Sequence, residues 1–183
     1  FNPINLNKIL EETLSVMEAE ISESGGTIKV GTLPDIDADP VQLHQLFQNL
    51  ISNALKYWKK DVSPFVNIYS QGNYNGNVTI NFEDNGIGFD EKFTDKIFQL
   101  FQRLHGKNEY EGTGIGLAIC KKIAEHHNGV ITVNSTLGVG SNFKVVLPKK
   151  QSRINSNEVA WNREVISLLM VEVLASVFEN AVV

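Results

Sequence analysis

The sequence predicts an α/β fold: a two-layer sandwich with helices packed on one face of a mixed, mostly antiparallel sheet. Segments with helical and strand periodicity are interspersed along residues 1–150. The last two expected strands are joined by the short link 135–140, which implies an antiparallel pair. The 183 residues and the apolar fraction of 42% suit one core of ordinary domain size with an appendage.

The first half contains two helical patterns separated by a short strand. Apolar residues at helical spacing predict a helix over 6–22, which a glycine pair ends, and a strand over 27–32. Asp39 and Pro40 predict the start of the next helix. An Asp side chain caps free amides there, and Pro suits the first helical position because its missing N–H would have no partner. A wide apolar face continues this helix to about Lys59.

The second half is richer in strands. Its expected elements, in chain order, are strands 65–70 and 77–82 joined by the turn-rich stretch 71–76, a short helix capped by Asp90 that includes Phe93, Ile97 and Phe98, a mobile loop over 104–111, a helix from Gly114 to His127, and strands 130–134 and 142–147. His44, His126 and His127 belong to no motif, and we expect them at the surface or at helix ends.

The character of the sequence changes after residue 150. Residues 151–157 are polar, and 159–183 are rich in Val and Leu, with a possible helical stripe from Ile166 to Val177. We therefore divide the chain into a domain over 1–150 and a tail over 151–183. The tail is interpreted either as a packing or self-association helix or as an artificial addition.

Composition excludes several functions. A net charge of −5 and a pI near 5.4 provide no basic surface for nucleic acid or an anionic membrane, so a polyanionic ligand needs a local site. The single cysteine, Cys120, lies in an apolar helical pattern, which favours a buried thiol over a nucleophile. Because one cysteine cannot form an internal disulfide, we expect a cytoplasmic location. No signal segment or membrane-spanning run occurs, so an anchor of the parent protein would lie outside this sequence.

A row of polar side chains crosses the apolar helix after Pro40. In "LFQNLISNALKY", residues 46–57, Asn49, Asn53, Lys56 and Tyr57 lie near one side of the helix. Amides in an apolar helical pattern are costly unless they have partners. The border of an amphipathic helix could explain either asparagine alone, but it explains the aligned row less well.

Two glycine-rich stretches follow strands or open helices. "EDNGIGFD", residues 83–90, comes after an alternating strand and could be only a chain-reversing turn, because Asn-Gly favours hairpins. "GTGIGLAI", residues 112–119, opens a helix, where glycines let a phosphate approach the unpaired backbone N–H groups. Alone it is a weak signal, and the sequence contains neither a Walker loop nor a Rossmann fingerprint.

The order of five motifs is more specific than any one of them. N-x-x-x-N-A-x-K-Y, D-N-G-I-G-F, I-F-x-x-F-x-R, G-T-G-I-G-L-A-I and G-x-G-S-x-F follow one another along the chain. This order resembles the N, G1, F, G2 and G3 boxes of the ATP-binding catalytic domain of bacterial sensor histidine kinases, within the gyrase, Hsp90, histidine kinase and MutL superfamily and its Bergerat-type fold. The resemblance covers Phe1 to about Lys149, and "FQLFQRLH" is similar to the F box of phytochrome-type kinases.

The resemblance implies roles for the residues of the polar row. Asn53 would bind Mg²⁺, and because a neutral amide oxygen attracts the ion weakly, we expect the metal to arrive with ATP. Asn49 stands where hydrolysing members carry a Glu that activates water, so hydrolysis should be slow. Lys56 and Arg103 would neutralise phosphate charge. Tyr57 would lie beside the nucleoside, or would be only a half-buried core ring.

The glycine-rich motifs would hold the two ends of the nucleotide. In the family the aspartate at Asp84 accepts a hydrogen bond from the adenine amino group, whereas guanine would present a second acceptor to it. Gly86 and Gly88 would let backbone and base approach closely. The second motif would frame the phosphates through Gly112, Thr113, Gly114, Gly116 and Leu117. Residues 104–111 would form a lid over them.

The resemblance also implies partners. ATP would donate its γ-phosphate to a histidine on a separate helical dimerisation domain, with a response regulator receiver domain downstream. No H-E-x-R-like stretch occurs in this chain, so we expect a monomeric fragment that binds ATP and Mg²⁺ without phosphorylating itself, and without contacting nucleic acid or membrane. The alternatives are a non-catalytic nucleotide-sensing module, an ATPase of the gyrase or MutL kind, and an anti-sigma-type serine kinase; the last two carry a catalytic acid that Asn49 replaces.

Overall fold

The computed structural model describes residues 1–102 and 113–151, so the expected lid and almost all of the tail lie outside the described residues. In chain order the elements are β1 (Asn2–Asn5), α1 (Leu6–Val16), α2 (Glu18–Ser24), β2 (Thr27–Val30), β3 (Asp35–Ala38), α3 (Pro40–Lys56), β4 (Phe65–Tyr74), β5 (Asn77–Asp84), η1 (Glu91–Phe93), α4 (Gly116–His126), β6 (Val130–Thr136) and β7 (Gly140–Pro148).

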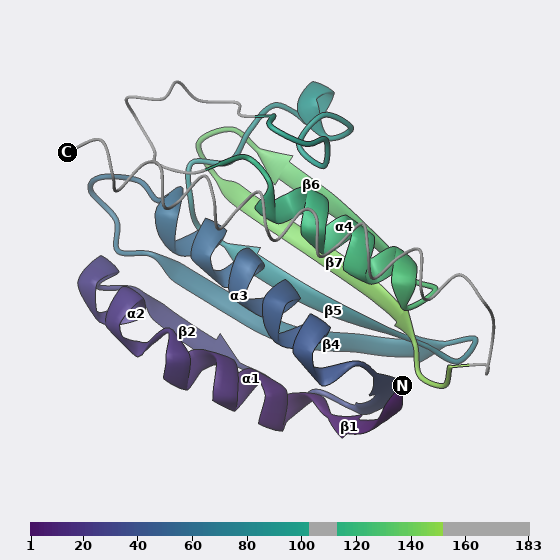
Figure 1. Cartoon of the computed structure of the whole chain (residues 1–183). Coiled ribbons are helices and arrows are strands. Elements are labelled where there is room, and N and C mark those ends of the chain that lie inside the picture. The colour runs from purple at the N-terminus through teal and green to yellow at the C-terminus, as the bar shows by residue number, and fades with distance from the viewer. Residues whose placement is uncertain (103–112, 152–183) are drawn as a thin grey trace, which may run out of the picture.

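The main sheet has five strands in the order β2-β4-β5-β7-β6. Only β2 and β4 pair in parallel, and the other three neighbours are antiparallel. The helices α1, α3 and α4 lie along one face of this open sheet (Figure 1). The structure therefore confirms the predicted two-layer sandwich on a mixed, mostly antiparallel sheet.

The core lies between α3 and the central strands. Leu46, Phe47 and Leu50 of α3 are buried against the sheet face that carries Ile80 and Phe82 of β5. The rings of Phe47 and Phe82 pack with their centroids 5.4 Å apart. Burial of each such side chain contributes about 1.5–3 kcal/mol, so this interface fixes α3 on the sheet.

Helix α3 begins where the sequence predicts it and ends earlier. The Asp39 carboxylate accepts hydrogen bonds from the backbone N–H groups of Val41 (2.9 Å) and Gln42 (3.2 Å), with Pro40 as the first helical residue. The helix ends at Lys56, before the predicted end at Lys59. Asn49, Asn53 and Lys56 of the polar row thus lie in its last turns, and Tyr57 is the residue that follows it.

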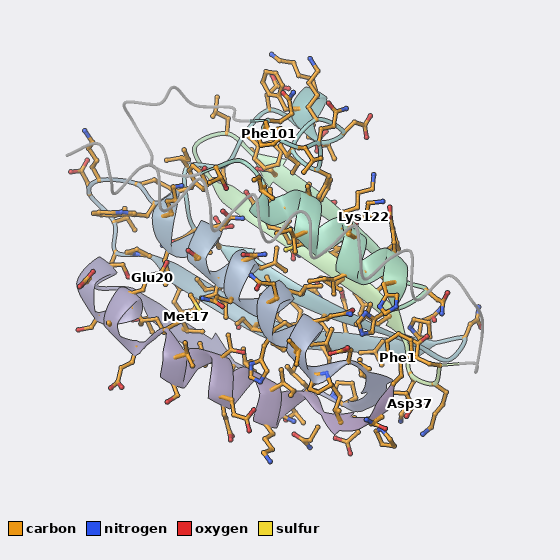
Figure 2. All side chains as sticks on the ribbon, in the orientation of Figure 1. Phe1, Met17, Glu20, Asp37, Phe101 and Lys122 are labelled. Carbon is orange, nitrogen blue, oxygen red and sulfur yellow. The ribbon has the colours of Figure 1, made fainter. Side chains whose placement is uncertain are left out.

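The N-terminal region differs from the sequence prediction in two ways. The predicted helix over 6–22 is two helices, broken at Met17, whose buried side chain lies between them and α3 (Figure 2). The N–H of Met17 still bonds Thr13 O and its carbonyl still accepts from Ile21, so the apolar period continues through the break and hides it. The strands β1 and β3, which pair antiparallel, were not predicted, because their sequences, NPIN and DIDA, are rich in Asn, Asp and Pro, which are depleted in strands.

The second half contains smaller corrections. Asp90 caps Lys92 N as expected, but the helix is a single 3₁₀ turn, and Ile97 and Phe98 lie in turns beyond it. Strands β4 and β5 extend into the stretch predicted as a turn, which is reduced to Asn75-Gly76; both residues have positive φ (53° and 78°), as a tight hairpin requires.

The last helix and strands also shift. Helix α4 begins at Gly116, two residues after the predicted start, and β6 and β7 are each longer than predicted. Within the described residues, no helix has the length and apolar character needed to cross a membrane.

His127 lies at the C-terminal end of α4, one of the two places expected for it, but it is fully buried and not at the surface. It follows the last residue of α4, and its Nδ1–H donates to Ile123 O at 2.8 Å, since a carbonyl can only accept. Its Nε2 accepts from Asp39 N at 3.1 Å, at the start of α3. Burial lowers the pKa of His127 to about 4, so the neutral ring joins the two helices.

We predict that protonation of His127 destabilises the fold in acid. Its pKa falls from 6.5 in the unfolded chain to about 4 in the fold, so the stabilisation is complete above pH 6.5 and is lost as the pH falls. Relative to His127→Gln, the wild-type free energy of unfolding should decrease by about 3 kcal/mol between pH 7 and pH 4. Urea denaturation at several pH values measures this difference, and parallel profiles would contradict the prediction.

Candidate nucleotide-binding site

A cavity of about 100 Å³ opens between the C-terminal end of α3, the start of α4 and the strand ends. It is mostly apolar with a few polar groups, as small-molecule sites are. Of the residues predicted for the site, those lining the cavity are Asn53, Tyr57, Asp84, Gly88 and Leu117. Lining residues that were not named as site residues are Ala54, Ile87, Phe89, Ile97, Gln102, Ser141 and Phe143.

A backbone hydrogen bond joins the end of α3 to the loop after β5. The carbonyl of Tyr57 accepts a hydrogen bond from Ile87 N at 2.9 Å. This contact brings Asn53 and Tyr57 to the same cavity as the end of β5. Lys56 Nζ lies 5.1 Å from the centroid of the Tyr57 ring and does not line the cavity.

Asn49 lies one turn earlier on α3 and faces α4. Its Nδ2 donates to Gly116 O, and its Oδ1 accepts from Gln45 Nε2, both at 3.3 Å. Asn49 is not among the residues lining the cavity. The two asparagines of the polar row thus differ: Asn49 fastens α3 to the first turn of α4, and Asn53 borders the cavity.

Asp84, the last residue of β5, is a carboxylate held by two backbone donors. Its Oδ1 accepts from Gly86 N (2.8 Å) and Ser141 N (3.2 Å), and no hydrogen bond to its Oδ2 comes from the described residues. Burial raises the pKa of Asp84 to about 6, against the lowering effect of both hydrogen bonds and of Lys59. At pH 7 the side chain is therefore mainly charged and acts as an acceptor at the cavity.

The glycines of the "DNGIG" stretch are required by packing against the protein itself. A Cβ on Gly86 would lie 2.3 Å from Tyr57 O. Gly88 has a φ of +58°, and a Cβ there would lie 2.1 Å from Thr136 O. The loop therefore fits against the end of α3 and the β6–β7 hairpin, which explains why the strand does not end in an ordinary two-residue turn.

The N-terminus of α4 lies at the other end of the cavity. None of the described side chains caps it and its first turn contains no acidic residue, so its N–H groups suit an anion. Gly114 precedes it with a φ of 72°, and its carbonyl accepts from Phe101 N. Thr113 is half-buried at the edge of the described residues. Arg103 and Gly112, also predicted for this end, lie outside them.

The arrangement of a carboxylate at one end and an uncapped helix start at the other agrees with a comparison of sequences. The model of the family described as "Histidine kinase-, DNA gyrase B-, and HSP90-like ATPase" matches residues 38–151, more than half of the chain. The chain belongs to this family. The resemblance inferred from the five motifs is thereby confirmed.

Known proteins resemble this chain in sequence and in fold. The phytochrome-like protein Cph1 of Synechocystis sp. is 44% identical over 144 residues, which are 79% of this chain and 19% of that protein. A mycobacterial sensor histidine kinase, MprB, has a TM-score of 0.71 at 21% identity, covering 82% of this chain and 99% of that chain. Full-length ShkA, solved in complex with AMPPNP, has a TM-score of 0.70 at 25% identity, covering 82% and 31%.

Of these proteins, MprB is a sensor histidine kinase, and the phytochrome-like one agrees with the similarity inferred for "FQLFQRLH". The role of an ATP-binding catalytic domain of this kind is thus supported for the chain. The chain spans only about a fifth of the length of the phytochrome-like relative it matches.

The cavity-lining residues that were not named as site residues all lie within the five motifs. Ala54 belongs to N-x-x-x-N-A-x-K-Y, Ile87 and Phe89 to D-N-G-I-G-F, Ile97 and Gln102 to I-F-x-x-F-x-R, and Ser141 and Phe143 to G-x-G-S-x-F. The motifs themselves could therefore have predicted these residues.

The residues present fit a Mg²⁺ ion that is bound mainly by a nucleotide. Asn53 offers one amide oxygen at the cavity, a hard ligand of the kind Mg²⁺ accepts. Across residues 1–102 and 113–151, no group of three or more His, Cys, Asp or Glu side chains is arranged to hold a metal. Such a donor set leaves most coordination positions to phosphate oxygens and water.

We predict that Gly88→Ala lowers the free energy of unfolding of this protein far more than Gly138→Ala does. Both residues have positive φ, +58° and +79°, so each substitution strains the backbone by about 1 kcal/mol. Only the Cβ at residue 88 meets another atom, Thr136 O, whereas nothing lies within 4 Å of the Cβ at residue 138. Urea denaturation should show an extra loss of roughly 2 kcal/mol or more for Gly88→Ala. Equal losses would show that the close approach is not a constraint.

Proposed function

We propose that this chain is the catalytic domain of a sensor histidine kinase, which binds ATP with Mg²⁺ and presents the γ-phosphate to a histidine on another domain. The proposal rests chiefly on the buried carboxylate of Asp84 at one end of a cavity whose other end is an uncapped helix start. It also draws on the family membership of the chain.

The base of ATP is assigned to the Asp84 end of the cavity. Oδ1 is occupied by Gly86 N and Ser141 N, which leaves Oδ2 as the acceptor for an exocyclic amino group. Adenine provides such a group, and guanine would bring a carbonyl oxygen against the carboxylate. Phe143 and Tyr57 add aromatic surface for the purine and sugar.

The phosphates are assigned to the start of α4. Its free N–H groups favour negative charge, and Gly114 and Gly116 keep side chains out of the approach. Lys56 and Arg103 would neutralise charge on the transferring group. Mg²⁺, held by Asn53 together with the nucleotide, would neutralise part of the negative charge of the phosphate oxygens. This would reduce the repulsion among them and between them and the attacking nucleophile.

Transfer to a histidine is favoured over hydrolysis because none of the described residues at the cavity offers a base for water. Asp84 is the only carboxylate among the cavity-lining residues that the structure describes, and it belongs to the base end. Asn49 has both ends of its amide bonded to protein groups and an amide cannot accept a proton from water. The γ-phosphate is thus preserved for another nucleophile.

The acceptor is assigned to a helical dimerisation domain of the same parent protein, with a response regulator receiver domain as the next acceptor. The length of the phytochrome-like relative, about five times that of the matched segment, leaves room for such domains. A cytoplasmic location follows from the need for ATP. We expect the isolated chain to be a monomer, with residues 151–183 as a separate tail after the domain.

We predict that Asp84→Asn weakens ATP binding by about tenfold to a hundredfold, the cost of losing a charge-assisted hydrogen bond. Asn can retain the Oδ1 contacts, so the fold should remain, but its amide N–H₂ would face the adenine amino group. Isothermal titration measures the affinity. Asp90→Asn, on the same loop but capping η1, is the matched control and should bind as the wild type does.

The affinity should also depend on pH through the same carboxylate. The pKa of Asp84 is raised to about 6, so wild-type affinity should decline as the pH falls below 6, when the acceptor becomes protonated. Asp84→Asn should lack this decline, and it provides the baseline for protonation of the phosphates. Identical pH profiles, or unchanged affinity at pH 7, would refute the assignment of the base.

We predict that this chain alone acquires no acid-labile label from γ-labelled ATP, because it contains no acceptor histidine of the expected kind. Added helical dimerisation domain from a phytochrome-like relative should become labelled, and Asp84→Asn should reduce that transfer. Self-labelling of the chain would contradict the prediction. ATP binding without any transfer would favour a nucleotide-sensing module.

A further inference from the structure

A buried pair of serines lies behind the base end of the cavity. Ser135 on β6 and Ser141 on β7 are directly opposite in the strand register, with relative exposures of 5% and 9%. Their hydroxyl oxygens are 2.9 Å apart. Ser141 lines the cavity, whereas Ser135 does not and has no role in the function proposed above.

The hydrogen bonds of Ser135 use its full capacity. A hydroxyl has one proton and two lone pairs. Its proton goes to Gly140 O at 3.2 Å, because a carbonyl can only accept. One lone pair accepts from Phe89 N at 2.9 Å, and the other accepts the Ser141 hydroxyl. Every polar position of this buried side chain is therefore assigned.

Two of these contacts act on the surroundings of Asp84. The Gly140 carbonyl and the Ser141 N–H belong to one peptide unit, so Ser135 holds one end of that unit while the other end donates to Asp84 Oδ1 at 3.2 Å. Hydrogen bonds arranged in series polarise one another. The contact with Phe89 N holds the far end of the loop that begins at Asp84.

The Gly140–Ser141 peptide is packed closely against the residues around Asp84. Gly140 has a φ of +148°, and a Cβ there would lie 2.0 Å from Asp84 O. The loop is bonded to the hairpin again where Gly138 N donates to Ile87 O at 2.6 Å. Ser135, like Asp84 itself, thus forms hydrogen bonds to both the loop and the Gly140–Ser141 peptide, and it does so from the side opposite the cavity-lining carboxylate.

We propose that Ser135 is a positioning residue for nucleotide recognition: its hydroxyl holds the Gly140–Ser141 peptide so that the Ser141 N–H is directed at Asp84, and holds the following loop beside it. This inference rests on the proposed binding of the adenine base at Asp84. Ser135 touches no substrate, and it acts through Ser141, Phe89 and the carboxylate.

The test compares variants that remove the donor with one that keeps it. Ser135→Ala removes the hydroxyl, and Ser135→Cys fills the same space with a much weaker donor, which guards against a cavity-induced loss of folding. Ser135→Thr keeps the hydroxyl. Ser70→Ala is the matched control, because Ser70 makes a similar side-chain bond, to Thr32 O at 3.0 Å, away from the cavity.

We expect Ser135→Ala and Ser135→Cys to weaken ATP binding about threefold to tenfold, as for the loss of one net hydrogen bond. Their pH midpoint for binding should move upward, because a weaker Ser141 N–H contact leaves the charged form of Asp84 less favoured. The other charges acting on Asp84, Lys59 and Glu83, are unchanged in these variants. Ser135→Thr should restore both values, and Ser70→Ala should change neither.

A structural role alone would lower the melting temperature without moving the pH midpoint. Wild-type affinity and midpoint in folded Ser135→Ala or Ser135→Cys would therefore overturn the inference. The parallel Asp84→Asn titration separates it from the proposed function. If Asp84→Asn binds ATP normally, the base assignment fails together with this inference, whereas loss of binding in Asp84→Asn with normal binding in the Ser135 variants removes this inference alone.

Discussion

The burial of one carboxylate constrains this end of the molecule. Asp84 must remain charged near neutral pH while largely removed from water, and an ion in that position is costly unless hydrogen bonds compensate. Two backbone N–H groups supply them, one from the next turn and one from β7. Because backbone must approach so closely, residues 86 and 140 have no room for a Cβ. The glycines at 86 and 140 are therefore part of what lets backbone surround the charge, whereas Gly88 is required by its approach to Thr136 O.

The sequence predicts those elements whose causes are local. Helix α3 was predicted at its start because Asp39 and Pro40 act through their own neighbours, and its apolar face has a clear period. The break at Met17 was missed because the hydrogen bonds on either side keep the helical period. The burial of His127 was missed for a different reason: its partner at Asp39 N is 88 residues away, and a lone histidine has no pattern that reveals it.

The candidate site was predictable to a similar extent. The motif order led to Asn53, Tyr57 and Asp84, which the fold brings to one cavity. Helical spacing alone could not separate Asn49 from Asn53, since both lie on one side of α3, and their different roles were inferred only from the resemblance. Only the position of α4 distinguishes them, because Gly116 O meets the first amide and not the second. Likewise, Ser135 carries no motif of its own, and its importance arises from a strand register that places it opposite Ser141.

The pairing of α3 with α4 bears on how much reorganisation binding requires. The helices are joined at one end by Asp39 N and His127, and near the other by Asn49 and Gly116 O. Two such contacts far apart along the helices fix both their separation and their relative rotation. The distance from Asn53 to the free N–H groups of α4 is then set before any ligand arrives. A preformed site costs less conformational entropy on binding than one assembled by the ligand, so contacts that touch no nucleotide can still contribute to its affinity.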